Sequence, residues 1–426
     1  MALVVQKYGG SSLGTPELIL RVAQRVIATR AAGHDVVVVA SAMGDSTDDL
    51  LDLAARVSRA PGPARELDML LTSGERISNA LLAIALTDLG QPACSLSGPQ
   101  AGVFTTPEHG NARIVDVLPT RVRQELDRGQ VVLVAGFQGL CKDTDDVTTL
   151  GRGGSDTTAV ALAGALRADV CEIYTDVDGV CTADPRVVPA ARVLDRVPYA
   201  EMLELAAHGA KVLMPRSVEY ARRHGVAVHV RSSFTDRPGT LVADRPHPAD
   251  QEVEMEKTAV TAIAHDRGVA LVTVTGVPDD PTRTAKVFRV LADAGVEVST
   301  PVHKGTRGHV DLSFTVAHTS APTALTALHT AVTDIGFTAV TCDHQVGTIS
   351  VVGAALCSEV TATICETFAA LRVRVGLLTT SALRITALCA QDELDRAVRA
   401  LHEVFALSTD NIGDQAAVYA GTGRGW

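Results

Sequence analysis

Aromatic residues are scarce in this sequence, making up 3% of its 426 positions. That scarcity argues against the stacking platforms on which single-stranded nucleic acids bind. Positive charge is not in excess either, because 38 Lys and Arg stand against 49 Asp and Glu, which gives a net charge of −11. General binding to nucleic acids or anionic membranes is therefore not expected, since both need a basic surface.

Long hydrophobic runs are also missing. The longest run, at 36–40, is interrupted by Ser41 and is far shorter than the ~18 residues of a membrane helix. The first residues lack the charged and then apolar order of a signal peptide. We therefore expect a soluble, cytoplasmic protein.

No two of the eight cysteines form a C-x-x-C pair, so a zinc site or a thioredoxin-like site is not expected. We predict no metal-ligand cluster. A chain of this length does not need disulfides to hold its core. We interpret the cysteines as buried thiols in a reducing cytoplasm.

Hydrophobic residues make up 46% of the chain and charged residues 20%, a globular balance, and the length predicts two or three domains. The first 242 residues alternate between Val-rich runs and helical patterns. Continuous apolar strands separated by helices indicate an α/β fold with a largely parallel sheet covered on both faces. The predicted strands are 3–5, 36–40, 131–135 and 170–174, and the predicted helices begin at Pro16 and cover 156–167 and 200–208.

The composition changes near residue 243, where a polar segment with two prolines predicts a linker over 243–262. Two similar βαββ patterns follow, which predict a tandem repeat of small α+β modules at 263–343 and 344–411. A last strand at 414–420 is expected to return to the sheet of the first module. The predicted strands of the modules are 269–274, 296–302, 309–316, 347–353, 372–379 and 382–388, with helices at 283–294, 358–370 and 392–405.

A glycine pair follows the first strand, in the run Lys7-Tyr8-Gly9-Gly10-Ser11-Ser12. Adjacent glycines let a ligand approach the backbone, and amides at a helix start favour a phosphate. Lys7 adds a positive charge and the serines add donors. The pattern taken alone is also compatible with a plain strand–turn–helix corner.

A second glycine-rich run, 149–158, opens a predicted helix with Ser155 or Asp156 as its N-cap. Three glycines around Arg152 suit a guanidinium that must meet a carboxylate or a phosphate. A capped turn without a ligand is the alternative.

Further charges follow predicted strands or flank predicted helices. Asp176 and Asp178 come directly after the strand at 170–174, where open α/β sheets bind ligands, although an Asp-rich turn is also ordinary loop chemistry. Glu75 lies at a predicted helix start and is either functional or only a cap-type acid, and Lys211 offers a second cation. No Ser-His-Asp or Cys-His set stands out. The combination favours phosphoryl transfer, in which cations must stabilise charge on the phosphate oxygens.

The chain resembles the aspartate kinases of the amino-acid kinase family, in their single-activity actinobacterial form. Five motifs occur in family order: K-Y-G-G-S-S at 7–12, S-G-E at 73–75, G-F-Q-G at 136–139, T-L-G-R-G-G-S-D-T-T-A at 149–159 and Y-T-D-V-D-G-V at 174–180. The resemblance implies the amino-acid kinase fold, an open and mainly parallel sheet between helices, followed by two ferredoxin-like ACT modules.

The resemblance also implies the reaction, in which ATP with Mg²⁺ phosphorylates the β-carboxylate of L-aspartate to 4-phospho-L-aspartate, the first step towards lysine, threonine and methionine. Lys7 and Asp156 are the implied catalytic residues. The implied substrate-binding residues are Ser41, Thr47, Glu75 for the ammonium, Arg152 for the α-carboxylate, Gly153, Gly154 and Ser155. The implied nucleotide-binding residues are Lys7, Gly9, Gly10, Ser11, Ser12, Thr175, Asp176, Asp184, Arg186 and Lys211.

ACT modules in this family bind lysine and threonine, which inhibit the kinase. The loops of this chain depart from the family pattern: Thr282 replaces a glycine, and Pro301 lies inside a predicted strand. We hypothesise that the feedback inhibition is weak or absent, and the alternative is a regulated housekeeping enzyme with altered loops. The implied regulatory residues are Asp279, Thr282, Ser299, Thr380 and Ser381.

ACT modules usually pair edge to edge, so the resemblance implies a homo-oligomer. A separately made regulatory subunit, beginning at Met255, is also implied. Two other functions stay open. One is a kinase for another small amino or carboxylic acid, and the other is a catalytically silent amino-acid sensor.

Overall fold

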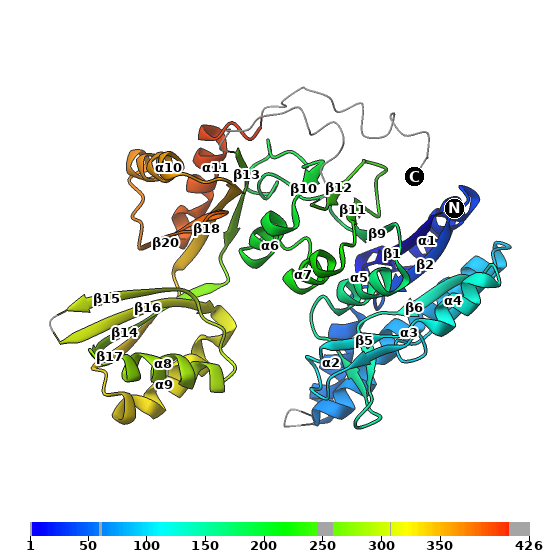
Figure 1. Ribbon diagram of the computed structural model, residues 1–426, viewed down its shortest axis with the longest axis horizontal. Helices are drawn as coiled ribbons and strands as arrows, with labels where there is room; N and C mark the ends of the chain where they lie inside the picture. The colour runs from blue at the N-terminus through cyan, green and yellow to red at the C-terminus, as the bar shows by residue number, and fades with distance from the viewer. Residues whose placement is uncertain (1, 59–61, 245–258, 307, 409–426) are drawn as a thin grey trace. The chain divides into compact units, whose positions relative to one another are not determined.

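The computed structural model describes residues 2–58, 62–244, 259–306 and 308–408, and the elements are labelled in Figure 1. The chain divides into two compact units. The first consists of residues 1–180 and 193–255, and the second of residues 181–192 and 256–426.

An eight-stranded sheet forms the centre of the first unit, and it is parallel except where β11 and β12 pair. The strand order is β10-β12-β11-β9-β1-β2-β6-β3, which confirms the predicted α/β class. The strands are β1 (Leu3–Tyr8), β2 (Asp35–Ala40), β3 (Ala93–Leu96), β6 (Val131–Ala135), β9 (Val170–Thr175), β10 (Arg196–Val197), β11 (Val228–Ser232) and β12 (Thr240–Val242).

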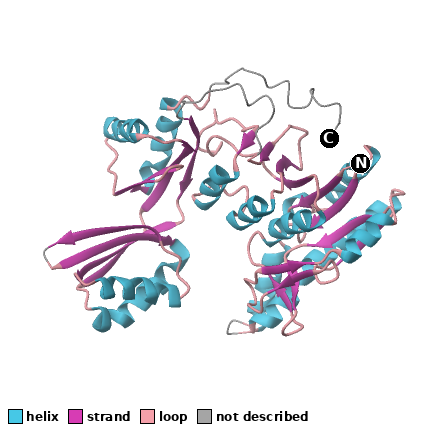
Figure 2. Cartoon of the chain, viewed as in Figure 1, coloured by secondary structure: helices cyan, strands magenta, loops and turns pink. Residues whose placement is uncertain are grey.

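Helices cover both faces of this sheet (Figure 2). Helices α1 (Pro16–Ala31) and α3 (Ala64–Asp88) pack on Val36, Val38 and Ala40 of β2. Helix α5 (Gly154–Leu166) contributes nothing to that cluster and packs against β1, β2 and β9. Because β2 is buried on both faces, it reads as an unbroken apolar run. The other elements of the unit are α2 (Ser46–Val57), α4 (Thr120–Asp127), α6 (Tyr199–Ala207), α7 (Pro215–His224), and a small sheet of β4 (Val103–Thr105), β5 (Ile114–Val117), β7 (Gln138–Cys141) and β8 (Val147–Thr149).

Strand β1 lies between β2 and β9, and it is parallel to both. The chain therefore leaves β1 towards β2 on one side and reaches β9 on the other, which makes this a point where the strand order reverses. Open α/β sheets bind ligands in the crevice at the carboxyl ends of such strands. The run that begins at Lys7 stands at this place.

Two antiparallel four-stranded sheets make up most of the second unit, each with a pair of helices. One sheet has the order β15-β16-β14-β17 and packs with α8 (Pro281–Asp293) and α9 (Ala321–Ile335). The other has the order β13-β18-β20-β19 and packs with α10 (Ser358–Leu371) and α11 (Leu394–Val404). The strands are β13 (Ala259–Asp266), β14 (Val269–Pro278), β15 (Ser299–Thr306), β16 (His309–Ala317), β17 (Ala339–Asp343), β18 (Val346–Ala354), β19 (Leu377–Thr380) and β20 (Arg384–Ala390).

Several expectations for this unit need correction. Residues 259–262, which the sequence places in a linker, belong to β13, and β13 pairs with β18 in the sheet of the second module. Helix α9 and strand β17 complete the first module and are not predicted from the pattern. The predicted return strand at 414–420 and the start at Met255 lie outside the described residues.

A short segment between β9 and β10 also belongs to the second unit. Val187 and Val188 of residues 181–192 are buried in the same cluster as Ile364 and Phe368 of α10. The backbone N–H of Ile263 in β13 donates to the carbonyl of Thr182 over 2.8 Å. The segment is therefore part of the core of the second module.

All eight cysteines are free thiols. Cys141, Cys171 and Cys389 are buried as predicted, but Cys357 and Cys365 are exposed, so the expectation of buried thiols is wrong for these two. Cys357 precedes α10 and Cys365 lies on the outward side of that helix. Among the described helices, none has both the length and the apolar character that crossing a bilayer requires.

Candidate active site

A buried ion pair stands at the carboxyl end of β1. The Nζ atom of Lys7 lies 2.6 Å from Oδ1 of Asp156, and the two side chains are 12% and 10% exposed. Asp156 occupies the first turn of α5, where the helix dipole favours a carboxylate. The pair fixes the ammonium group of Lys7 in the crevice before any ligand arrives.

The glycine pair after β1 brings two loops together. The N–H of Gly44 donates to the carbonyl of Gly10 over 3.0 Å, and a Cβ atom on Gly10 would lie 2.7 Å from the carbonyl oxygen of Gly44. Residues 10–12 form one turn of 3₁₀ helix, and α1 begins only at Pro16 with Thr15 as its N-cap. The amides beside the glycines are therefore those of the short turn rather than of α1.

Glu75 lies in the middle of α3, so its prediction as a helix-start carboxylate is wrong. Gly74 does not break the helix, because a Cβ atom there would lie 2.8 Å from Cβ of Ala42 and the close packing needs a glycine. Ser78, one turn further, donates to the carbonyl of Ser41 over 2.6 Å. These contacts hold α3 against the loop that follows β2.

The carboxyl group of Glu75 is 4% exposed, and its Oε2 atom has no hydrogen-bond partner in the described part of the chain. Burial raises the pKa of Glu75 to about 7, against hydrogen bonds from the backbone of Glu75 and Ala42 that lower it. A buried carboxylate with an unused oxygen is prepared for a cationic ligand.

Arg152 lies in the glycine turn before α5. Its side chain is exposed, and the described residues offer it no hydrogen-bond or ion-pair partner. Gly153 is the N-cap, with φ of 68°, so Ser155 and Asp156 lie inside the first turn and the prediction that one of them caps the helix is wrong. A Cβ atom on Gly153 would lie 2.0 Å from Cγ of Met214.

The remaining predicted substrate residues lie around these groups. Ser41 follows β2 and its N–H donates to the carbonyl of Tyr8 over 3.1 Å, while Thr47 lies in the first turn of α2. Gly154 is the first residue of α5, and a Cβ atom on Gly136 would lie 2.8 Å from Oγ of Ser155. The loops after β2 and β6 and the start of α5 are thereby packed together.

The predicted nucleotide residues are divided between the two units. Thr175 ends β9 and its hydroxyl donates to the exposed Asp176 over 3.0 Å, and Lys211 is exposed in the turn between α6 and α7. Asp184 and Arg186 belong to the second unit, where they form an ion pair with each other at 2.7 Å. The structure therefore brings Lys7, the glycines and Asp156 together within the first unit, whereas Asp184 and Arg186 belong to the second.

Asp68 and Arg216 were not predicted from the sequence, and Phe137 was noted only within the G-F-Q-G motif. Asp68 and Arg216 bind the loops beside Arg152 through several hydrogen bonds. The non-glycine Phe137 has φ of 70°, and its N–H donates to Thr158 Oγ1 while its carbonyl accepts from Leu150. Strained backbone of this kind gathers at functional sites. No local pattern marks Asp68, because the groups that it holds lie 42 and 81 positions later in the chain.

The five predicted regulatory residues lie in the two modules of the second unit. Asp279 and Thr282 flank the start of α8, where the N–H of Thr282 donates to Asp280 over 2.9 Å, and Ser299 opens β15. Thr380 ends β19, and Ser381 follows it in the turn to β20.

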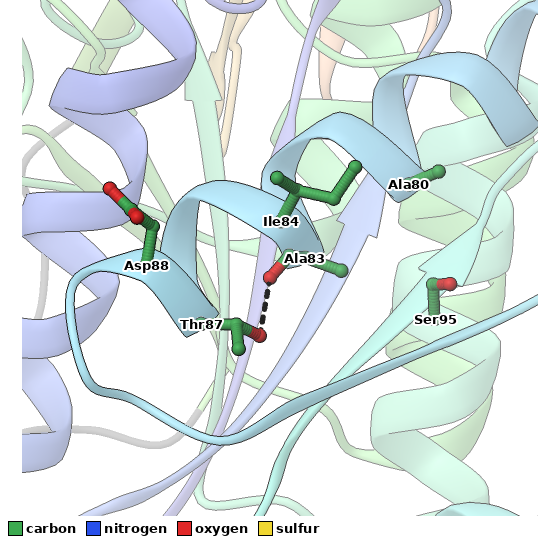
Figure 3. A pocket seen from close by; sticks show the side chains of 6 residues that line it. All are labelled: Ala80, Ala83, Ile84, Thr87, Asp88 and Ser95. Atoms are coloured by element: carbon green, nitrogen blue, oxygen red, sulfur yellow. Dashed lines mark hydrogen bonds between the residues drawn. The ribbon is translucent and has the colours of Figure 1, made fainter.

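Figure 3 shows a depression elsewhere on the first unit, lined by α3 and by Ser95 of β3. Its wall is made of Ala80, Ala83 and Ile84, and the hydroxyl of Thr87 donates back to the carbonyl of Ala83 over 2.8 Å. Asp88 is its one charged lining residue. A site without cations is unsuited to a nucleotide, so the ion pair at β1 remains the candidate.

Comparison with known proteins agrees with this geometry. The model of the amino acid kinase family matches residues 2–232, which is more than half of the chain. The chain belongs to the amino acid kinase family. An ACT domain model matches residues 349–405. The aspartokinase of Mycolicibacterium smegmatis is 57% identical and that of Corynebacterium glutamicum 54% identical, each over 100% of both chains.

Solved structures lead to the same family. Aspartokinase III of E. coli in complex with aspartate and ADP has a TM-score of 0.78 at 25% identity, covering 94% of this chain and 99% of that chain. The same E. coli enzyme in complex with lysine and aspartate has a TM-score of 0.72 at 25% identity, with the same coverage. The expected fold, a kinase unit with ACT modules, is confirmed.

Proposed function

We propose that this kinase transfers the γ-phosphoryl group of ATP to a β-carboxylate oxygen of L-aspartate, giving 4-phospho-L-aspartate and ADP. The bond from the γ-phosphorus to the bridging oxygen breaks as the bond to the carboxylate oxygen forms. We place catalysis in residues 1–242 and effector control in residues 263–411. The observations that carry the proposal are the buried, unpartnered oxygen of Glu75, the exposed guanidinium group of Arg152 before α5, and the fixed pair of Lys7 with Asp156 in the first turn of that helix.

The two unsatisfied groups suit the two α-substituents of an amino acid. Glu75 would accept hydrogen bonds from the α-ammonium group, and Arg152 would bind the α-carboxylate in a bidentate manner. Ser41, Thr47, Gly153, Gly154 and Ser155 would complete the substrate site. The β-carboxylate would then face the ammonium group of Lys7.

Lys7 would act on the phosphoryl group during its transfer. The donor and acceptor are both anionic, so a positive charge between them reduces their repulsion and stabilises charge on the equatorial phosphate oxygens. Asp156 holds Lys7 in place, and a preorganised charge needs no rearrangement at the moment of transfer.

The nucleotide would lie against the turn after β1, with Gly9, Gly10, Ser11 and Ser12 at its phosphates. Thr175, Asp176 and Lys211 would contact the rest of the nucleotide. We keep Asp184 and Arg186 in the proposal as nucleotide-binding residues, on the segment that belongs to the second unit. Their support is that they follow shortly after β9 in the chain.

Mg²⁺ would accompany ATP. The described residues contain no cluster of three or more His, Cys, Asp or Glu side chains that could hold a metal ion by themselves. That composition fits Mg²⁺, which usually binds through substrate phosphates, waters and one or two carboxylates. The ion would reduce the charge of the phosphates.

Trapping of the acyl phosphate with hydroxylamine tests the proposed reaction. With MgATP, wild-type protein should form a hydroxamate from L-aspartate together with an equal amount of ADP. A panel of three acids tests the specificity. Succinate lacks the ammonium group, 3-aminopropanoate lacks the α-carboxylate, and L-glutamate has both but carries its second carboxylate one methylene further away. A hydroxamate formed faster from another acid would replace aspartate as the substrate, and ATP turnover with none of them would indicate a sensor.

We further propose that inhibition by lysine and threonine is weak in this kinase. Support comes from β15, an edge strand whose pairing with β16 shifts register between Ser299 and Val302, with Pro301 inside and φ of 48° at Thr300. A distorted strand at a predicted effector residue is unfavourable for a tight pocket. Assays with both amino acids at millimolar concentrations should show little loss of activity, and strong concerted inhibition would contradict this.

We also propose that the ACT modules pair edge to edge in a homo-oligomer, and that a regulatory subunit starting at Met255 is made separately. Light scattering of the purified protein should give a mass of at least two chains. Expression of the natural coding sequence with a C-terminal tag should give a second, shorter tagged product, which a Met255→Leu variant should lose.

A further inference from the structure

Two loops meet next to Arg152. One is the loop that contains residues 106–112 and the other is the turn that follows β8. The N–H of Ala112 donates to the carbonyl of Thr149 over 2.9 Å, and the position of a Cβ atom on Gly151 lies 2.9 Å from the carbonyl oxygen of Gly110. The backbone on either side of Arg152 is therefore closely packed, while its guanidinium group is exposed and has no partner among the described residues.

Asp68 holds both loops from the side of α3. Its carboxylate is 1% exposed and accepts hydrogen bonds from the ring nitrogen Nδ1 of His109 at 2.7 Å and from the N–H of Gly110 at 3.1 Å. It also accepts from the N–H of Thr149 at 3.1 Å and from its hydroxyl at 2.5 Å. One buried anion thus gathers four donors, two from each loop.

Arg216 holds the same two loops from the side of α7. Its guanidinium donates to the carbonyl of Leu150 over 3.1 Å and to the carbonyl of Ala112 over 2.6 Å. No carboxylate of the described chain pairs with it. Arg216 thus binds backbone acceptors where Asp68 binds donors, and the two charges clamp the turn that carries Arg152 from both sides.

Asp68 also connects this clamp to Glu75. The two residues lie seven positions apart on α3, which is two helical turns and therefore the same face of the helix. A rigid helix thus carries the proposed ammonium ligand and the anchor of the turn with the proposed carboxylate ligand. The distance between the two ligand groups is set by this helix and by the hydrogen bonds of Asp68.

We infer that Asp68 and Arg216 are positioning residues that hold Arg152 at the correct distance from Glu75, and so determine how the kinase recognises the α-carboxylate of its substrate. The inference rests on the proposed function. Neither residue needs to touch the substrate, because each acts through the backbone of the Arg152 turn. A displacement of about 1 Å in such a group is enough to cost a large factor in efficiency.

The first test uses Asp68→Asn, which keeps the size of the side chain but places an amide donor among four donors. The KM for L-aspartate should rise by about tenfold or more, while the KM for ATP should stay within about twofold. Only the binding of the α-carboxylate by Arg152 is weakened in this variant. Asp35→Asn is the matched control, since Asp35 forms an ion pair with Arg30 at the start of β2. Equal rises in both KM values for Asp68→Asn would indicate a general loss of structure and overturn the inference.

Two competitive inhibitors distinguish recognition of the α-carboxylate from recognition of the ammonium group. Succinate keeps both carboxylates and lacks the ammonium group, whereas 3-aminopropanoate keeps the ammonium group and lacks the α-carboxylate. Asp68→Asn should weaken inhibition by succinate by the same factor as aspartate binding, and it should leave 3-aminopropanoate within about twofold. Equal weakening of both inhibitors would contradict a role through Arg152.

A double-mutant cycle gives the decisive result. In an Arg152→Ala background, Asp68→Asn should change kcat/KM for aspartate by less than about twofold, because the group it positions is gone. The same factor in both backgrounds would show that Asp68 does not act through Arg152. Arg216→Lys repeats the cycle with a point charge that cannot serve two carbonyls at once. Either variant is sufficient, so a folding failure of one leaves the other to decide.

The same data distinguish this inference from the proposed function. If the wild type phosphorylates aspartate and the variants match it, only the inference fails. If the wild type does not phosphorylate aspartate, the proposed function fails before the variants are compared.

Discussion

Replacement of the buried Glu75 by glutamine should make the kinase more stable at alkaline pH and should abolish its binding of aspartate. The pKa of Glu75 is raised by burial from 4.5 to about 7. Between these two values the folded chain keeps a proton that the unfolded chain has released, so stability falls as pH rises through this window. The full loss is 2.5 pKa units, or about 3 kcal/mol, and it is complete above pH 7.

The glutamine variant carries no charge at this position and should escape that loss. Its stability relative to wild type should therefore improve by about 3 kcal/mol between pH 4.5 and pH 8, which is roughly 6–12 °C in Tm for a unit of this size. Differential scanning calorimetry with ADP, following the transition that ADP shifts, measures this difference. L-aspartate should restore stability to the wild type at pH 8, because its ammonium group pairs with the ionised carboxylate, but not to Glu75→Gln.

Glu125→Gln is the matched control, since Glu125 is also buried but has Arg128 as its partner at 2.9 Å. It should show no gain at pH 8. A raised pKa of Glu75 is refuted if the Tm difference between Glu75→Gln and wild type stays constant from pH 4.5 to pH 8, or if the wild type becomes relatively more stable as pH rises.

Two further substitutions test the packing. Gly153→Ala should lower kcat/KM by at least about tenfold and reduce Tm, because its Cβ atom would clash with Met214. The control is Gly129→Ala, which has a similar positive φ of 76° but nothing within 4 Å of the added Cβ atom, and it should cost only about 1–2 kcal/mol of unfolding free energy. Equal losses for the two variants would exclude a steric cause. Val188→Ala should lower the free energy of unfolding of the second unit by about 1–3 kcal/mol, because this side chain is only 6% exposed in the core of that unit. Val57→Ala is the control and should change stability very little, because Val57 is 83% exposed. Scanning calorimetry of both variants shows whether residues 181–192 belong to that core.

Local sequence patterns predicted much of the kinase unit. Valine runs marked the buried strands, since a strand covered on both faces is apolar at every position, as in β2. The glycine turns could also be found, because backbone packed as closely as at Gly10 and Gly153 tolerates no side chain. The motifs placed Lys7 and Asp156 in the same site, and the structure brings them within 2.6 Å.

The failures concern contacts between distant residues. Gly74 was interpreted as part of a helix start. It is instead a glycine inside α3 that leaves room for Ala42, which lies more than thirty positions earlier in the chain. The first residues of β13, 259–262, were interpreted as part of a linker because their partner β18 lies some 90 positions later in the chain. Asp68 resembles any helical acid until the two loops that bury it are known.

The most direct test of the account is a comparison of binding and transfer in Lys7→Ala. Isothermal titration of L-aspartate in the presence of ADP should give a Kd within about threefold of wild type, because Glu75 and Arg152 remain, whereas kcat for hydroxamate formation should fall by about 10²–10³-fold. Lys286→Ala, which breaks a surface ion pair with Asp334, is the control. A Lys7→Ala enzyme whose kcat stays within about twofold of wild type would contradict the central role given to this charge.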